Sequence, residues 1–74
     1  MGKGGTMNTA DLQRAVTNAR KARSRAEQTE KDGDYGIAAG FYRNAAALWR
    51  IAKDEPAAEK CDVKADECLR KDYQ

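Results

Sequence analysis

Apolar residues recur at spacings of three and four positions along most of this chain, which is the period of an α-helix. In the first periodic segment, residues 9–31, these positions form one stripe that is mostly alanine. Asn8 or Thr9 can cap the start of the segment, and Gly33 can end it because glycine tolerates a left-handed backbone conformation. The pattern predicts a long helix with a single buried face.

The second periodic segment, residues 35–53, is apolar over more than half of its circumference. One stripe consists of Ala38, Tyr42, Ala45, Trp49 and Ala52, and an adjacent stripe consists of Ile37, Phe41 and Leu48. Asp34 directly precedes the segment and is a suitable N-cap residue. A helix this broadly apolar has to be covered on two sides, so we expect it to lie between two other helices.

The third periodic segment, residues 57–71, follows Pro56, which interrupts the pattern. Asp54 or Glu55 can cap its start. Its apolar face is built almost entirely from small side chains, and it consists of Ala58, Cys61, Ala65, Cys68 and Leu69. The opposite side of the segment is charged, so this helix too is expected to bury one face.

The connections between the three segments are short, and short connections place consecutive helices antiparallel to each other. The sequence therefore predicts an all-α fold, an antiparallel up-down-up three-helix bundle with the second helix in the middle. The predicted domain covers residues 9–72, and residues 1–8 are expected to be a flexible N-terminal leader.

The composition limits the chemistry that this chain can perform. The 74 residues include no histidine, and 35% of them are charged although the net charge is only +2. No nucleophile–base pair, phosphate-binding loop or metal-binding cluster stands out, so we expect no enzyme activity, no metal and no cofactor. The longest apolar run, residues 45–49, is far shorter than the roughly 20 residues of a membrane-spanning helix.

Cys61 and Cys68 are seven positions apart. On one helix this spacing separates them by about 10.5 Å along the axis, which exceeds the limit of about 7 Å between the Cα atoms of a disulfide. We expect two free thiols that act as small core residues, as is typical of a reducing, cytoplasmic environment.

Several stretches resemble one known helical family. The run Gly33-Asp34-Tyr35, followed by Ala38, Tyr42 and Ala45, is similar to the second half of a tetratricopeptide repeat, but only one copy is present. A single hairpin of this kind with a lengthened second helix and a charged third helix resembles the MIT (microtubule-interacting and trafficking) domain. The resemblance covers about 12–71. It includes LQRAV at 12–16, GDYGIAAGFYRNAAAL at 33–48 as the loop and second helix, and KADECLRK at 64–71, with Cys68 where an aromatic residue is common in the family.

The resemblance implies a non-catalytic binding module with no chemistry of its own. MIT domains usually form the N-terminal part of AAA ATPases or other trafficking proteins. They dock short C-terminal segments of filament-forming membrane-remodelling proteins, either amphipathic or extended, in a groove between the second and third or the first and third helices. By this resemblance the partner is a protein, any membrane contact is indirect, and the isolated domain is a monomer.

The residues alone also point to a groove, because a third helix of small residues cannot fill the space beside a broadly apolar second helix. The candidate groove residues are Phe41, Leu48, Cys61, Asp62, Ala65, Asp66, Cys68 and Leu69. Asp62, Asp66 and Glu67 would form its rim and could pair with basic side chains of a partner. The alternative is that the small residues simply allow close helix packing and that the acidic residues are a solvated face.

A second hypothesis is binding of nucleic acid or of an anionic surface through a basic run. The run consists of Arg20, Lys21, Arg23 and Arg25, with Arg14 nearby. Four acidic residues follow closely and no aromatic residue is interleaved to stack on a base, which argues against nucleic acid. Self-association through an uncovered part of the second helix is a third possibility.

Overall fold

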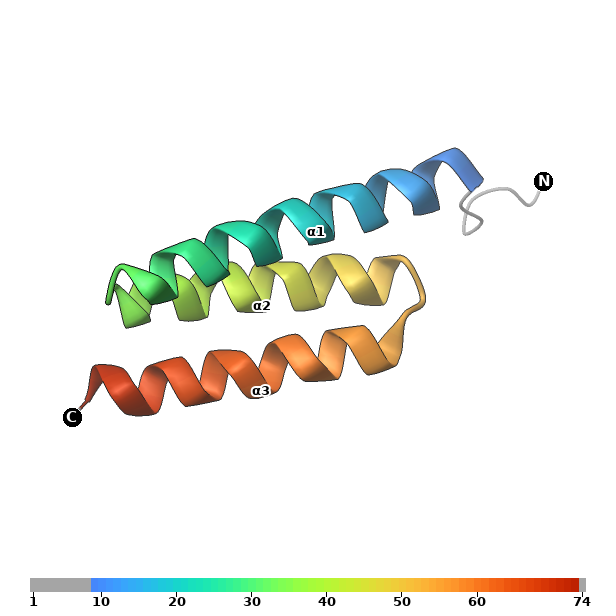
Figure 1. Ribbon diagram of the computed structural model, residues 1–74. Helices are drawn as coiled ribbons and strands as arrows, with labels where there is room; N and C mark the ends of the chain where they lie inside the picture. Colours follow the sequence, from blue (N-terminus) through green and yellow to red (C-terminus); the bar gives the residue numbers. More distant parts are fainter. Residues whose placement is uncertain (1–8, 74) are drawn as a thin grey trace.

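The computed structural model describes residues 9–73, which form three helices in the order α1 (Thr9–Lys31), α2 (Tyr35–Ile51) and α3 (Glu55–Asp72) (Figure 1). The helices alternate in direction. The middle helix, α2, packs along both α1 and α3, whereas α1 and α3 approach each other only weakly. The prediction of an all-α, up-down-up three-helix bundle with the second helix in the middle is confirmed.

The predicted leader, residues 1–8, and the predicted capping residue Asn8 lie outside the described residues. Within the described part of the chain, no helix is long and apolar enough to cross a membrane. The bundle is elongated, with principal dimensions of 52 × 16 × 16 Å, so it presents long seams between adjacent helices.

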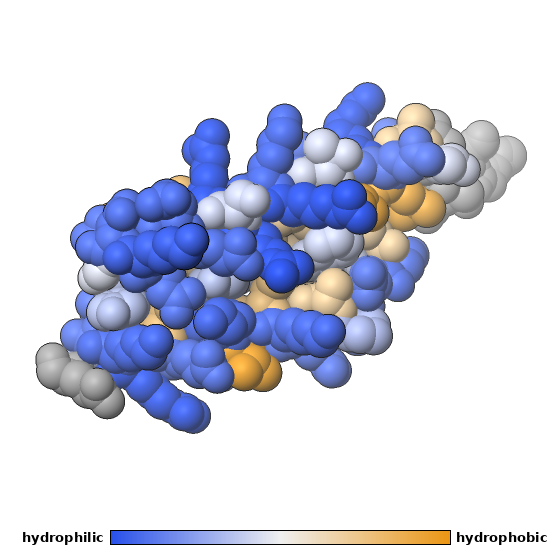
Figure 2. Space-filling view, viewed as in Figure 1, coloured by the Kyte–Doolittle hydropathy of each residue, from blue (hydrophilic) through white to orange (hydrophobic). Residues whose placement is uncertain are grey.

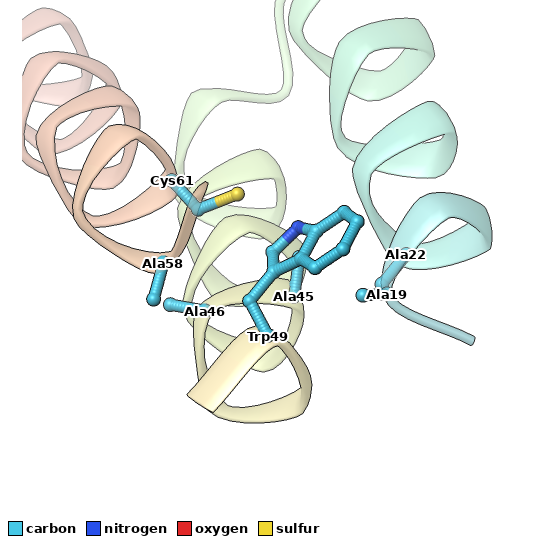
Figure 3. Close-up of a cluster of buried hydrophobic side chains, with 7 residues drawn as sticks. All are labelled: Ala19, Ala22, Ala45, Ala46, Trp49, Ala58 and Cys61. Carbon is cyan, nitrogen blue, oxygen red and sulfur yellow. The ribbon is translucent and has the colours of Figure 1, made fainter. Parts of the chain in front are cut away.

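The core consists mainly of alanine. The larger buried side chains are Tyr42 and Trp49, both from α2, and the two buried cysteines come from α3. In one half of the bundle the Trp49 ring lies between Ala19 and Ala22 of α1 and the thiol of α3 (Figure 3). In the other half, Tyr42 is surrounded by alanines from all three helices. The small residues therefore bring the helices close together, and two large rings fill the remaining space.

Both helix connections end the preceding helix with the same backbone motif. Gly33 has φ +87°, and its N–H donates to the carbonyl of Glu30 while the N–H of Asp34 donates to the carbonyl of Thr29. These are the paired hydrogen bonds of a Schellman motif. Asp34 stands at the N-cap of α2 as expected, but its carboxylate makes no capping hydrogen bond.

The second connection corrects two predicted boundaries. The helix predicted to end at residue 53 ends at Ile51, because Lys53 adopts φ +67° and leaves the helical conformation. The helix predicted to start at residue 57 starts at Glu55, because Pro56 fits the first turn, where its missing N–H is not needed. Asp54 is the N-cap, and its Oδ1 accepts a hydrogen bond of 3.2 Å from the N–H of Ala57.

These two left-handed positions should respond oppositely to substitution. Gly33→Ala is expected to lower the unfolding free energy by about 1 kcal/mol, because a Cβ is disfavoured at positive φ. Lys53→Gly is expected to raise the unfolding free energy by up to about 1 kcal/mol, because it relieves the same strain. Urea denaturation followed by circular dichroism measures both changes. Equal signs for the two variants would contradict this account.

Candidate functional site: the groove between α1 and α3

A groove of about 920 Å³ runs between α1 and α3. Its floor is formed by Tyr42 and Trp49 of α2, because α1 and α3 both pack on α2 and leave the space between them unfilled. Arg20 lies along the α1 side, and Ala57 and Lys60 lie along the α3 side. Figure 2 shows this face of the molecule, where pale and orange atoms lie in the hollow between two rows of hydrophilic side chains.

Glu30 links α1 to α3 next to this groove. Its carboxylate accepts a 2.9 Å hydrogen bond from the hydroxyl of Tyr42 and lies 3.5 Å from Nζ of Lys64 and 3.6 Å from Nζ of Lys71. The two ammonium groups also lie over aromatic rings. Nζ of Lys64 is 5.8 Å from the centroid of the Tyr42 ring, and Nζ of Lys71 is 5.5 Å from the centroid of the Tyr35 ring. The side chain of Glu30 is only 17% exposed, so this cluster is a partly buried set of polar contacts that connects α1 to α3.

The surroundings of Glu30 change its titration. Burial acts to raise the pKa of the carboxyl, but the hydrogen bond from Tyr42 and the charges of Lys64 and Lys71 outweigh it and hold the pKa below the usual 4.5. Burial and the bond to Glu30 raise the pKa of Tyr42, so its hydroxyl stays protonated and able to donate. The charged carboxylate and the neutral phenol therefore stabilise each other.

This coupling predicts a pH dependence. The carboxyl has a lower pKa in the folded than in the unfolded chain, so its stabilising contribution is present above about pH 4.5 and is lost as the pH falls further. Glu30→Gln is expected to lower the unfolding free energy by about 1–2 kcal/mol at pH 7 and by much less at pH 3. Urea denaturation at several pH values measures this, with the exposed Glu59→Gln as the matched control. Parallel pH profiles for Glu30→Gln and the wild type would contradict the role of Glu30.

The cysteines are free, and both are buried, as the spacing predicted. Burial raises the pKa of the Cys61 thiol, against the smaller opposite effects of Arg23 and of the Trp49 N–H, and burial also raises the pKa of Cys68. The indole N–H of Trp49 has no hydrogen-bond partner among the described residues. It points toward the sulfur of Cys61, which is at most a weak acceptor (Figure 3).

The seam between α2 and α3 holds the acidic residues that were expected to face a partner. Asp62 lies 2.7 Å from Nη2 of Arg50, and Glu55 lies 3.0 Å from Nε of the same side chain. Asp66 lies 3.3 Å from Nη2 of Arg43. These acidic side chains join the two helices of the chain to each other, and Glu67 pairs with a lysine of its own helix.

The structure separates the remaining predicted groove residues. Ala65 and Cys68 are fully buried beside Tyr42, and Leu69 is half-buried against the same cluster, so they belong to the core. Cys61 is buried but lines the groove between α1 and α3.

Phe41 and Leu48 border a hollow between α1 and α2, which corrects the expectation that they meet the small residues of α3. The reason is their angular position on α2. They lie on the side opposite to Arg43 and Arg50, and it is these arginines that face α3.

The basic run divides between two faces of α1. Arg20 and Arg23 line the groove with α3, and Nε of Arg23 lies 3.2 Å from a carboxylate oxygen of Glu27. Lys21 and Arg25 border the hollow with α2. Successive helical residues differ by about 100°, so a run of cations in sequence does not make one basic patch on this helix.

The sequence pattern predicted that Tyr42 and Trp49 belong to the core, but not that they form the floor of a groove. It also did not predict the polar contacts of Glu30 that connect α1 to α3. The periodic pattern shows that both rings are buried, but not that the helices covering them leave a gap. Comparisons of the chain with protein-family models, with curated proteins and with solved structures found no match, so the MIT resemblance stays a prediction.

Proposed function

We propose that this chain is a non-catalytic docking module that binds a short peptide segment of a partner protein in the groove between α1 and α3. The groove volume of about 920 Å³ carries the proposal, because it falls within the roughly 300–1,000 Å³ that is usual for ligand-binding clefts. Its floor is formed by Tyr42 and Trp49, which are 2% and 7% exposed, so a bound segment would contact only the small exposed parts of these rings.

The walls of the groove indicate how a peptide would be oriented. Arg20 and Lys60 supply positive charge on the two sides, while Glu27 and Glu59 supply negative charge. A segment with apolar anchors over the aromatic floor and charged residues at its edges matches this pattern. Charges of both signs on the walls contribute more to the register and the specificity of a bound peptide than to its affinity.

The MIT resemblance supplies the class of partner. On this basis the segment is a C-terminal amphipathic or extended motif of a filament-forming, membrane-remodelling protein. The same resemblance makes the chain a domain of a cytoplasmic AAA ATPase or another trafficking protein, with the ATPase activity outside these residues. The absence of histidine from the chain agrees with a role in binding.

The test is a titration of the labelled domain with C-terminal peptides of such filament proteins. Trp49 is the single tryptophan, so its fluorescence reports directly on the floor of the groove. We expect a fluorescence change together with amide shifts along the facing sides of α1 and α3. Ala57→Phe, which fills one end of the groove, should weaken binding, whereas Ala10→Phe on the exposed start of α1 should not. Shifts confined to other seams would contradict the proposal.

A further inference from the structure

The outward face of α2 is uncharged and uncovered. Its exposed or half-exposed positions are Ile37, Gly40, Phe41, Asn44, Ala47, Leu48 and Ile51, while Arg43 and Arg50 lie at its edge toward α3. Ile37 is 60% exposed and Ile51 is 45% exposed, in a chain of which 35% of the residues are charged. A Cβ added at Gly40 would meet nothing within 4 Å, so no contact within the described chain requires glycine there.

The large residues of this face have the spacing of a coiled-coil seam. Ile37, Phe41, Asn44, Leu48 and Ile51 follow one another at intervals of four, three, four and three residues. This alternation is the pattern with which one helix packs its side chains into the gaps of a neighbouring helix. Ile37, Asn44 and Ile51 of this seam are exposed, whereas Phe41 and Leu48 are half-buried at its α1 edge.

A hollow of about 380 Å³ lies next to the seam, between α1 and α2. Phe41 and Leu48 border it from α2, and Asn18, Lys21 and Arg25 border it from α1. We call this surface, made of the seam and these three α1 residues, the α1/α2 face. The valley between two helices has the shape that receives the side-chain ridge of a third helix.

The charges of the α1/α2 face are unbalanced. Neither Lys21 nor Arg25 forms an ion pair with any described residue, whereas the arginines of α2 and two lysines of α3 all have acidic partners. Both side chains are exposed on the same side of α1, beside an apolar seam. A partner that fits must therefore bring apolar side chains for the seam and carboxylates for these two cations.

We propose that the α1/α2 face is a second docking surface, which binds an acidic amphipathic helix of another protein as a fourth helix of the bundle. Its apolar side chains pack between Ile37 and Ile51, and its Asp or Glu side chains pair with Lys21 and Arg25. A polar residue opposite Asn44 fixes the register. The surface is separate from the groove between α1 and α3, so the proposal does not depend on the proposed function.

Two other occupants fit less well. A second copy of the chain would not present carboxylates beside an apolar seam. Asp62, Asp66 and Glu55 are paired with arginines of their own chain. Asp32 and Asp34 lie in the α1–α2 connection, Glu59 lines the groove between α1 and α3, and Asp72 ends α3. An anionic membrane would neutralise the cations, but it would also press the amides of Asn18 and Asn44 into a hydrophobic layer. A helix can hydrogen-bond these amides and still cover the seam.

The probe is a synthetic acidic peptide of about three heptads, with leucine or isoleucine at the seam positions and glutamate on the flanks. The control peptide carries lysine in place of each glutamate. Amide shifts of the labelled domain map the site, and fluorescence anisotropy of dye-labelled peptide gives the affinity. We expect the acidic peptide to shift the amides of the α1/α2 face, with affinity that falls as salt increases, and the lysine peptide to bind far more weakly.

Charge reversal then tests the surface itself. Lys21→Glu with Arg25→Glu is expected to weaken binding of the acidic peptide by about tenfold or more and to strengthen binding of the lysine peptide. Ile37→Glu, at an exposed position that the fold does not need, should weaken binding of the acidic peptide. The matched reversal in the groove between α1 and α3, Arg20→Glu on α1 with Lys60→Glu on α3, should leave that binding unchanged.

Four results would overturn the proposal. They are equal binding of the two peptides, a response of Trp49 fluorescence with shifts in the α1/α3 groove, concentration-dependent dimerisation through α2, and binding of phosphatidylserine vesicles without binding of the acidic peptide. None of these results except the second bears on the groove, so failure of this proposal and failure of the proposed function can be told apart.

Discussion

Trp49→Ala is expected to unfold this domain or to loosen it severely. The side chain is only 7% exposed and is the largest member of the cluster that joins α1, α2 and α3 in one half of the bundle. Truncating a buried aromatic residue costs about 3–5 kcal/mol, because it removes apolar burial and leaves a cavity. A chain of 74 residues has little stability in reserve, so a loss of this size is comparable with the total. Circular dichroism during thermal and urea denaturation measures it.

The matched control is Trp49→Phe. The indole N–H has no hydrogen-bond partner among residues 9–73 and only points toward the weakly accepting sulfur of Cys61, so phenylalanine removes little polar stabilisation and keeps most of the apolar ring. Its cost should therefore be well below that of Trp49→Ala, limited to the part of the ring volume that is lost. A Trp49→Ala variant that melts close to the wild type would show that the helices can close around the gap.

Ala45→Leu is expected to have the second-largest effect. Ala45 is completely buried, in the same cluster as Ala19 and Ala22 of α1. Close packing of α1 on α2 depends on small side chains at this contact, so three added carbon atoms have to push the helices apart. Overpacking of this kind costs about 1–3 kcal/mol. Urea denaturation followed by circular dichroism gives the change in unfolding free energy.

Ala47→Leu provides the comparison, two residues further along α2. Ala47 is exposed on the outward face of the helix, so the same substitution there is expected to change the unfolding free energy by no more than about 0.5 kcal/mol. If the two variants were equally destabilised, the effect would come from leucine in α2 generally and not from the α1–α2 contact.

The elements of the fold follow closely from local chemistry. Apolar periodicity places the three helices, and the broadly apolar second segment has to lie between the other two. Gly33 marks one connection, because left-handed backbone is cheap only for glycine. The spacing of Cys61 and Cys68 is sufficient to predict two free, buried thiols.

The connection between α2 and α3 has a backbone conformation that the local sequence does not predict. Lys53 takes φ +67°, which is unfavourable for lysine and cannot be read from its identity. The surrounding contacts impose it, since the N–H of Asp54 bonds back to the carbonyl of Trp49 and its carboxylate caps α3. The predicted end of the second helix and the predicted start of the third helix were therefore each wrong by two residues.

The candidate site was harder to predict because periodicity gives the angle of a residue about its own helix axis and not the neighbour that it faces. The sequence shows that Phe41 and Leu48 lie on one flank of α2, while Arg43 and Arg50 lie on the other. A three-helix chain with α2 in the middle can place α3 on either side of the α1–α2 plane, and the two arrangements exchange those flanks.

The pattern of residues thus accounts for three helices, their antiparallel order, the central place of α2 and the alanine-rich core. Tertiary packing determines on which side of the α1–α2 pair α3 lies. With α3 on the observed side, Arg43 and Arg50 point toward the carboxylates of α3. The same arrangement turns Phe41 and Leu48 toward α1. These contacts join residues that are 12 or more positions apart in the chain, and their energies compete only once the helices have packed together.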